Sequence, residues 1–187
     1  AGGIRSFLRA PDNVEMMGDC GAFQYRNEEK PPYSCEETCS FYDEIGFDYG
    51  MTLDHMIFEF DEEYDASTTL FGKEPTEEMH HRRDISIINA LKMKEIWDSK
   101  KYSYKLIGAI QGWSPESYKK SATELINKGF DYLALGGLAR ANDKQILSVI
   151  HCLNPILQKS NTKVHVLGVA RLSLIEDYMK CNVASCD

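Results

Sequence analysis

The sequence predicts an α/β protein built on one parallel sheet, and three observations lead to this prediction. Short apolar runs alternate with amphipathic stretches from residue 14 to the end of the chain. Such an alternation favours parallel strands joined by right-handed helical crossovers. The 187 residues, 43% hydrophobic and 27% charged, are also enough for one sizeable core and too apolar for a disordered chain.

The expected strands are six short apolar runs bounded by polar or glycine residues. They cover residues 14–18, 49–53, 105–110, 132–135, 163–167 and 182–186. Strands that alternate with helical patterns are typical of repeated βα units.

The first expected helix runs from Ser34 to about Ile45. Ser34 can cap its start, and Glu36 and Glu37 suit the positive end of the helix dipole. Gly46 suits the exit of the helix, because glycine tolerates the left-handed backbone found there.

A longer helix is expected from Thr76 to about Trp97, with an apolar face formed by Ile85, Ile88, Leu91 and Met93. Ser114 and Pro115 make a strong start for the next helix, which Gly129 closes. Two further helices are expected at about residues 143–157 and 172–179.

Two architectures fit this pattern, an open doubly wound sheet and a (β/α)8 barrel. No glycine-rich phosphate loop follows the first strand, which weakens the dinucleotide-binding form of the open sheet. A complete barrel usually needs about 250 residues, so this chain would be a barrel that lacks roughly two units. We expect one domain, residues 1–187, with an acidic surface insertion of six Glu and two Asp at about 59–78.

Composition argues against several classes of protein. The 29 acidic and 21 basic side chains, a net charge of −8, argue against a protein that coats DNA, although they allow a local basic groove. No apolar stretch approaches the roughly 18 residues that span a bilayer, and no signal-peptide pattern opens the chain. Six irregularly spaced cysteines do not resemble a disulfide scaffold, so we expect a cytoplasmic location. The Ala-Gly-Gly start and the end at Asp187 suggest a piece of a longer chain.

Polar or glycine residues follow almost every expected strand. They are Asp19, Asp54, Gln111, Gly136, Gly137, Gly168 and Asp187. Because the carboxyl ends of parallel strands meet at one rim, we expect these residues to form one site. Each alone has an ordinary explanation, since an Asp after a strand often caps a helix and Gly-Gly often makes a turn. Their combination favours a ligand site.

This set of residues suits chemistry on a nucleoside. Paired carboxylates around the anomeric carbon of a sugar supply a nucleophile and a general acid or base. A third acidic group and a glutamine amide can recognise a purine edge, and Gly-Gly lets backbone N–H groups approach a ring carbonyl. Phe23 can cover the face of the base, although core packing is a more ordinary use of such a side chain.

Short motifs in collinear order resemble the tRNA-guanine transglycosylase family. They are, with the family's version of each in parentheses, 19–24 Asp-Cys-Gly-Ala-Phe-Gln (Asp-Ser-Gly-Gly-Phe-Gln), 110–112 Ile-Gln-Gly (Val-Gln-Gly), 129–131 Gly-Phe-Asp (the same), 135–138 Leu-Gly-Gly-Leu (Gly-Gly-Leu) and 167–169 Leu-Gly-Val (Met-Gly-Val). Asp187 falls where the family's nucleophilic Asp follows the next strand. The resemblance covers nearly the whole chain and implies a (β/α)8 TIM barrel, incomplete in this chain with about six βα units.

Two further segments resemble the DNA-modifying branch of that family, called DpdA. They are residues 29–34 (Glu-Lys-Pro-Pro-Tyr-Ser) and 46–55 (Gly-Phe-Asp-Tyr-Gly-Met-Thr-Leu-Asp-His). This resemblance implies exchange of guanine in DNA for a 7-deazaguanine such as preQ0. Residues 139–142 (Ala-Arg-Ala-Asn) lack the Gly-Glu common in the tRNA enzymes, which argues against those enzymes' anticodon-loop contacts.

Position by position, the resemblance implies a role for each rim residue. Asp187 attacks C1′ and carries the covalent sugar intermediate, and Asp19 beside the base serves proton transfer or positioning. Asp54 and Gln111 hydrogen-bond the purine edge. Backbone, packing or pocket contacts complete the substrate-binding set, from Phe23, Gly136, Gly137, Leu138 and Gly168.

The resemblance also implies partners. DNA, or alternatively tRNA, would meet Arg140, Lys144 and Arg171 through its phosphates, although ordinary surface charge also explains these side chains. The zinc site of the family, Cys-x-Cys-x-x-Cys with a later His, would lie beyond residue 187, so no metal or cofactor is expected in this chain. Whether the protein forms a homodimer or uses partner subunits stays open.

Three alternatives to exchange on DNA stay open at this point. The first is the same exchange on tRNA. The second is a truncated or inactive nucleic-acid-binding barrel, favoured by the absence of closing strands and of basic surface. The third is a hydrolase that releases guanine to water.

Overall fold

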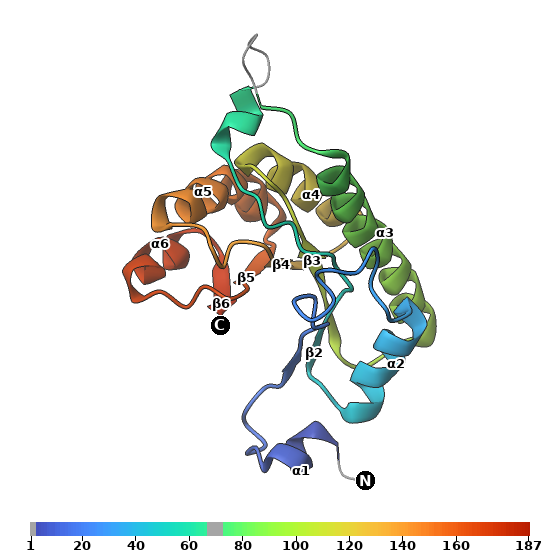
Figure 1. Cartoon of the computed structure of the whole chain (residues 1–187). Coiled ribbons are helices and arrows are strands. Elements are labelled where there is room, and N and C mark those ends of the chain that lie inside the picture. Colours follow the sequence, from blue (N-terminus) through green and yellow to red (C-terminus); the bar gives the residue numbers. More distant parts are fainter. Residues whose placement is uncertain (1–2, 67–72) are drawn as a thin grey trace.

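The computed structural model describes residues 3–66 and 73–187, which contain one six-stranded sheet. Its strands are β1 (Met17–Gly18), β2 (Tyr49–Met51), β3 (Lys105–Ile110), β4 (Tyr132–Leu135), β5 (Lys163–Val166) and β6 (Val183–Cys186). All neighbouring strands run parallel, and their order across the sheet is their order in the chain. The sheet curls into a half-barrel with helices outside it (Figure 1), which confirms the predicted incomplete barrel.

Helices precede and connect the strands. They are α1 (Ile4–Leu8), α2 (Cys35–Ile45), α3 (Glu77–Lys100), α4 (Pro115–Asn127), α5 (Asp143–Ser160) and α6 (Ile175–Lys180), with 3-10 turns η1 (Glu62–Ala66) and η2 (Leu172–Leu174). The predicted start of α2 is confirmed, because Ser34 and Glu37 form a capping box there. The predicted start of α4 is also confirmed by its N-cap Ser114 and first residue Pro115. No helix of the described residues is both long and apolar enough to cross a membrane.

Helix α3 buries a face that overlaps the predicted one only in part, since Met93 is buried as predicted. Its buried positions recur at helical spacing and are Met79, Arg83, Ser86, Ile87, Ala90 and Met93. Ile88, predicted for the buried face, is 63% exposed. Its neighbour Ile87 is buried, and successive side chains of a helix point about 100° apart. Ile85 and Leu91 are only half-buried. The prediction assumed that the apolar residues of the helix are the buried ones. In the structure the buried side of the helix also contains the polar Arg83 and Ser86.

Two short elements were not predicted. Helix α1 precedes the sheet, and its Arg5 pairs with Asp48 next to β2 at 2.7 Å. The turn η1 lies in the predicted acidic insertion, where Lys73 pairs with Glu59 at 2.8 Å and with Asp61 at 3.1 Å. Residues 67–72 of that insertion lie outside the described residues.

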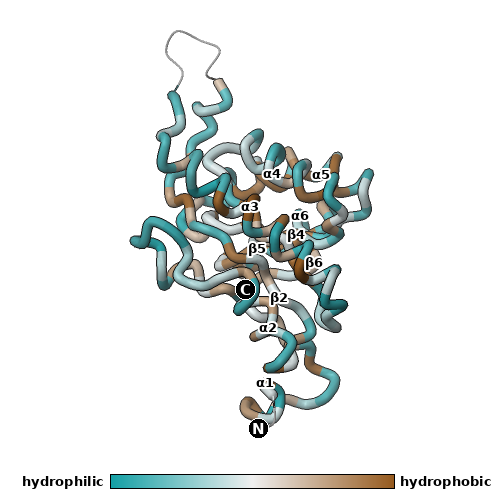
Figure 2. The backbone as a smooth tube through the Cα atoms, turned by 90° about the vertical axis from the view of Figure 1, so that its right-hand side faces the viewer, coloured by the Kyte–Doolittle hydropathy of each residue, from teal (hydrophilic) through white to brown (hydrophobic). Residues whose placement is uncertain are grey.

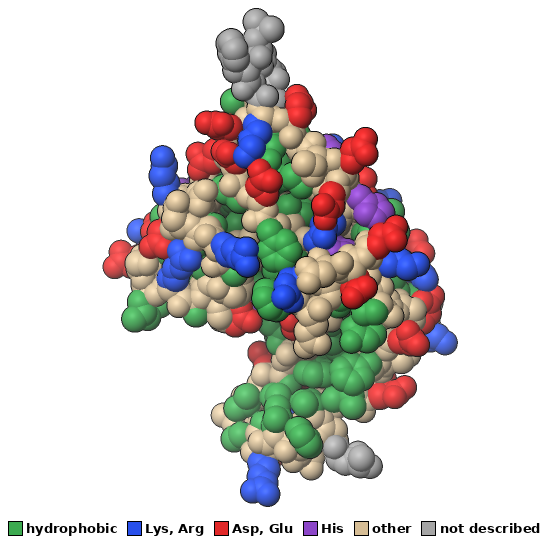
Figure 3. Space-filling model, in the orientation of Figure 1, with side chains coloured by type: hydrophobic (Ala, Val, Ile, Leu, Met, Phe, Trp, Pro, Cys, Tyr) green, Lys and Arg blue, Asp and Glu red, His purple; other side chains and the backbone are tan. Residues whose placement is uncertain are grey.

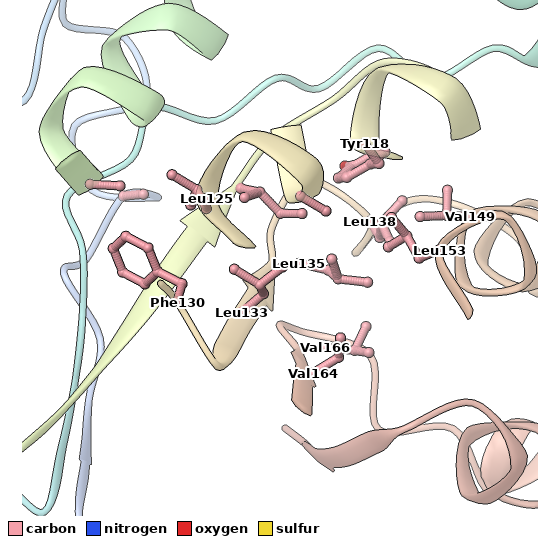
Figure 4. Close-up of a cluster of buried hydrophobic side chains, with 14 of the residues drawn as sticks. Tyr118, Leu125, Phe130, Leu133, Leu135, Leu138, Val149, Leu153, Val164 and Val166 are labelled. Carbon is pink, nitrogen blue, oxygen red and sulfur yellow. The ribbon is translucent and has the colours of Figure 1, made fainter. Parts of the chain in front are cut away.

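Apolar side chains form one layer on each side of the sheet. The outer layer lies between the strands and the helices, and Figure 4 shows side chains of β4, β5, α4 and α5 meeting there. A smaller cluster covers the concave side and consists of Met51, Ile107, Ala109, Tyr132 and Ala134. In Figure 2 the hydrophobic stretches lie on the strands and on the helix sides next to them. Alternate residues of each strand therefore face the concave side.

Strand β6 contains a bulge that shifts this alternation. Val164 of β5 pairs with Val183, but the next residue, His165, pairs with Ser185, so Ala184 is an extra residue. Val183 packs against the outer core, whereas Ser185 contacts His165. The bulge thus turns Ser185 to the concave side, although simple alternation would place it on the same side as Val183.

Candidate active site

The residues predicted at the strand ends follow their strands along one rim. Asp19 follows β1, Gln111 follows β3, Gly136 follows β4 and Asp187 follows β6. In each case the residue two positions earlier lies on the concave side, namely Met17, Ala109, Ala134 and Ser185. Because strand side chains alternate, these four rim residues also belong to the concave side of the half-barrel.

Asp54 and Gln111 form the centre of the rim. The Gln111 side-chain amide donates a hydrogen bond of 2.5 Å to Asp54 Oδ2, and its own oxygen accepts one of 3.2 Å from the N–H of Ile57. Both side chains are almost completely buried. This network fixes the amide orientation, so the carboxylate and the amide form one rigid unit.

Cys20 and Tyr25 contact the other side of Asp54. The Cys20 thiol donates to Asp54 Oδ1 at 3.1 Å, and the Tyr25 hydroxyl donates to the backbone oxygen of Asp54 at 3.0 Å. Both side chains come from the loop after β1, so this loop is tied to the residue that follows β2. Burial next to Asp54 raises the pKa of the Cys20 thiol well above its usual value, which keeps it protonated as a donor.

Burial also changes the acidity of Asp54. Desolvation raises its pKa from 3.8 to about 6, although the hydrogen bonds from Gln111 and Cys20 act in the opposite direction. At neutral pH the group is therefore mainly a carboxylate, and it becomes an acid only slightly below neutrality.

The Gly-Gly turn lies directly against the Asp54–Gln111 unit. A Cβ at Gly136 would lie 2.1 Å from the Gln111 amide nitrogen, and one at Gly137 would lie 2.7 Å from its oxygen. Gly137 also has a φ of 81°, which favours glycine. The Tyr118 hydroxyl donates a 2.5 Å hydrogen bond to the Gly136 oxygen. Glycine is therefore required at this turn for close approach as well as for the backbone conformation.

Asp19 is exposed, unlike the buried Asp54. Nearby protein atoms desolvate it and raise its pKa, and the negative charge of Asp187 raises it further. Backbone N–H groups of Gly21 and Cys20 partly offset these effects. Asp19 follows the first strand of the sheet and Asp187 follows the last, so the two carboxylates lie at the two ends of the rim.

Asp187 lies at the end of β6 with one oxygen directed at the protein. Its Oδ1 accepts a hydrogen bond from the backbone N–H of Gly168, which has a φ of 70°. The same oxygen lies 3.8 Å from Nε2 of His165 on β5. Gly168 and Asp187, both predicted for the site, are thus in direct contact, and His165 lies next to Asp187.

His165 is the residue that the sequence interpretation missed. It is buried on the concave side of β5, and desolvation lowers its pKa, whereas the charges of Asp187 and Asp19 act to raise it. Its Nδ1 lies 2.7 Å from the Ser185 hydroxyl, which lies 2.7 Å from that of Tyr132. The only sequence signal was a polar residue inside an otherwise apolar strand.

Phe23 and Leu138 occupy contrasting positions. Phe23 is 57% exposed beside the rim, with the guanidinium of Arg26 located 4.2 Å from its ring centroid. An exposed aromatic ring agrees with the predicted cover for a base. Leu138 is completely buried in the outer core, so its contribution is packing behind the Gly-Gly turn.

The three cations predicted to contact phosphates differ in their exposure and ion pairing. Arg140 and Lys144 are exposed, and the Arg140 guanidinium lies 5.4 Å from the centroid of the Phe58 ring. Arg171 instead pairs with Asp143 at 2.6 Å and donates to the backbone oxygen of Ala141 at 2.8 Å. Figure 3 shows basic side chains interspersed with acidic ones on the face in view.

A cavity of about 620 Å³ opens beside Asp19. Its lining comes from α2 and the preceding loops, and it meets the rim through Asp19, Cys20 and Gly21. Asp54 and Gln111 do not line it. A purine can therefore reach the Asp54–Gln111 unit only after surrounding side chains move.

The cysteines of the described residues form neither disulfides nor a metal-binding cluster. Among the described residues, all six are free, and no group of three or more His, Cys, Asp or Glu side chains is arranged to hold a metal ion. Cys35 and Cys39 are buried between α2 and α3, where the Cys39 sulfur lies 3.8 Å from the backbone oxygen of Met93. Their role is packing.

Comparison with known proteins gives one informative similarity. No family model matches the chain. A DNA-guanine transglycosylase of Salmonella montevideo is 37% identical to it over 185 residues. The aligned part covers 99% of this chain and 43% of that protein, so the chain spans less than half the length of this curated relative.

Proposed function

Since this chain belongs to the tRNA-guanine transglycosylase-like family, we propose that the protein exchanges guanine in DNA for a 7-deazaguanine of the preQ0 type through a covalent aspartyl-sugar intermediate. The observation that carries the proposal is the arrangement of the rim, where Asp19, the Asp54–Gln111 unit and Asp187 follow parallel strands of one curled sheet. The relative's name supports DNA as the nucleic acid, and the incoming base follows from the resemblance of residues 29–34 and 46–55 to the DNA-modifying branch.

Asp187 is the proposed nucleophile. Its Oδ1 is fixed by the Gly168 N–H, and the hydrogen bonds of the described residues leave its Oδ2 unpaired. Attack of Oδ2 on C1′ forms the carbon–oxygen bond, while the C1′–N9 bond breaks and its electron pair leaves with guanine. N9 of the incoming base then attacks C1′ from the side that guanine left, and Asp187 is released as a carboxylate.

Asp19 is the proposed proton carrier. Its pKa is raised by desolvation and by the charge of Asp187, which favours the protonated form of a carboxyl group. Protonation of the departing guanine leaves Asp19 as a carboxylate, which then accepts the proton of the incoming base. The second half of the exchange thereby restores the starting state.

Asp54 and Gln111 are the proposed readers of the base. A guanine edge offers N–H donors beside a carbonyl acceptor, and a carboxylate with an adjacent amide is complementary to it. Each carboxylate oxygen can accept more than one hydrogen bond, so Asp54 can bind guanine while keeping its contacts with Cys20 and Gln111. Gly136 and Gly137 leave room for the Gln111 side chain that reads the base, and Phe23 covers the face of the base.

The substrate nucleotide has to leave its helical stack. A base within a duplex cannot reach a rim of this kind, and flipping it out costs a few kcal/mol. Arg140 and Lys144, the two exposed cations, are the proposed contacts for flanking phosphates, and Arg171 contributes once it exchanges Asp143 for a phosphate.

The test is a base-exchange assay with the full-length protein on matched DNA and tRNA. Release of labelled guanine from DNA, dependent on added preQ0, supports the proposal. Release without added base indicates a hydrolase, and release from tRNA alone indicates the tRNA reaction. The Asp187→Ala variant should lose the covalent protein–DNA adduct and the exchange together. Exchange that persists in this variant contradicts the assigned nucleophile.

A further inference from the structure

His165 contains a buried nitrogen without a hydrogen-bond partner. The side chain is 5% exposed, and among the described residues Nε2 has no partner within hydrogen-bond distance. Such groups are rare, because an unsatisfied buried polar atom costs free energy. Asp187 Oδ1 lies 3.8 Å from it, so a small movement of the exposed Asp187 side chain would give Nε2 a partner.

The contacts of the other ring nitrogen are compatible with a proton on Nε2. Nδ1 lies 2.7 Å from the Ser185 hydroxyl, which lies 2.7 Å from the Tyr132 hydroxyl. Tyr132 can donate to Ser185 and Ser185 to Nδ1, so that Nδ1 is the acceptor. A neutral ring then carries its proton on Nε2, facing an oxygen that can only accept. The opposite tautomer would place two lone pairs against each other.

The bulge in β6 places Ser185 and Asp187 next to the His165 ring. It pairs Ser185 with His165 and turns both Ser185 and the following Asp187 toward the concave side. The ring therefore bonds Ser185 of β6 through Nδ1 and faces Asp187, just after β6, with Nε2. Its titratable surroundings are Asp187 after β6, Asp19 after β1 and the Tyr132 hydroxyl of β4.

We propose that His165 is a positioning residue for the nucleophile, whose Nε2–H donates a hydrogen bond to Asp187 Oδ1. This inference rests on the proposed function, in which Asp187 attacks C1′. With the Gly168 N–H and His165 both on Oδ1, the second oxygen of the carboxylate stays free to attack C1′. The hydrogen bond also stabilises Asp187 when it departs as a carboxylate at the end of the exchange.

The first test is spectroscopic and does not depend on activity. Nitrogen-15 NMR of the full-length protein labelled at histidine should show His165 with its proton on Nε2 at pH 7. His165→Gln identifies the signal by removing it. In the Asp187→Ala variant the Nε2 signal should shift, because its acceptor is lost. A ring protonated on Nδ1 alone, or a signal indifferent to Asp187→Ala, overturns the proposal.

The second test compares two substitutions of His165. His165→Phe removes the donor while keeping a ring, and adduct formation on guanine-containing DNA should slow by about 10- to 100-fold, as expected for one hydrogen bond to a charged group. His165→Gln keeps an N–H donor at a similar reach, so it should recover most of the rate. His151 on α5 is exposed and provides the matched control, since His151→Phe should leave the rate unchanged.

A split between rate and affinity separates positioning from a structural effect. Loss of the donor should slow adduct formation in His165→Phe and not in His165→Gln. Guanine affinity should stay within about twofold, because the base-reading unit is untouched. If Asp187→Ala removes the adduct but His165→Phe behaves as wild type, the inference about His165 is wrong and the proposed function stands. If Asp187→Ala retains the adduct, the proposed function fails as well.

Discussion

Gln111 donates its amide proton to Asp54 across the ends of two neighbouring strands, at 2.5 Å, and this contact organises the rim. The pair is buried, so its geometry does not depend on solvent. Cys20 approaches Asp54 from one side and Gly136 approaches Gln111 from the other. Changes at these two neighbours are therefore predicted to alter base recognition without touching Asp19 and Asp187, the proposed catalytic carboxylates.

Gly136→Ala should displace Gln111. The new Cβ would lie 2.1 Å from the amide nitrogen, so the side chain must move and its bond to Asp54 must break. We expect guanine affinity, measured by titration calorimetry, to fall at least tenfold, and the free energy of unfolding to fall by about 1–3 kcal/mol. Gly46→Ala is the control, because nothing lies within 4 Å of its Cβ. It should cost about 1 kcal/mol through its positive φ and leave guanine affinity unchanged.

Guanine binding should weaken as pH falls through about 6. Asp54 has a pKa of about 6, and only its ionised form accepts hydrogen bonds through both oxygens. We expect affinity to be full at pH 7.5 and reduced about tenfold at pH 5. The Asp54→Asn variant should bind guanine weakly at both values. An affinity that does not change between these pH values in the wild type would show that Asp54 does not read the base.

The same group should make stability depend on pH. Its folded pKa lies above its unfolded value of 3.8, so its contribution is most favourable below about pH 4 and is lost as pH rises through about 6. Asp54→Asn removes this contribution. Between pH 4 and pH 7 the wild type should therefore lose roughly 2–4 kcal/mol of unfolding free energy relative to the variant. Urea denaturation at the two pH values measures this shift.

Cys20→Ser should be tolerated and Cys20→Ala should not. Serine retains a donor to Asp54 Oδ1, whereas alanine leaves that oxygen with one contact fewer. For alanine we expect guanine affinity to fall by about 2- to 10-fold and the acidic limb of binding to move to higher pH. Equal behaviour of the two variants would mean that the thiol serves only to fill space.

Arg140→Ala and Arg171→Ala should have different effects. Arg140 is exposed and makes no ion pair among the described residues, so its loss should weaken DNA binding and reduce the salt dependence by about one counterion. Arg171 is engaged with Asp143, so its loss should cost about 1 kcal/mol of stability and affect DNA binding less. Fluorescence anisotropy at several salt concentrations distinguishes these outcomes, and equal losses of affinity would contradict the distinction.

The rim could be predicted because a parallel α/β sheet places the ends of its strands together. Asp54, Gln111 and Gly136 could be assigned to one site from their positions after apolar runs. The buried face of α3 could not, because Ile88 is as apolar as Ile87 and only packing against the sheet distinguishes them.

His165 could not be predicted for a different reason. Its partners Ser185 and Asp187 are distant in the chain, and simple alternation places Ser185 on the same side as the outward-facing Val183. A one-residue irregularity in β6 reverses this expectation. A lone histidine in a strand therefore carries no signal until the neighbouring strand is in place.

Ala184, the extra residue of β6, has a consequence for how such a protein can evolve. It separates the strand into an early part that packs against the helices and a later part that directs Asp187. Substitutions at Val183 can adjust the packing against the helices without rotating Asp187. Selection on the fold and selection on the rim can then act on adjacent positions with little mutual constraint.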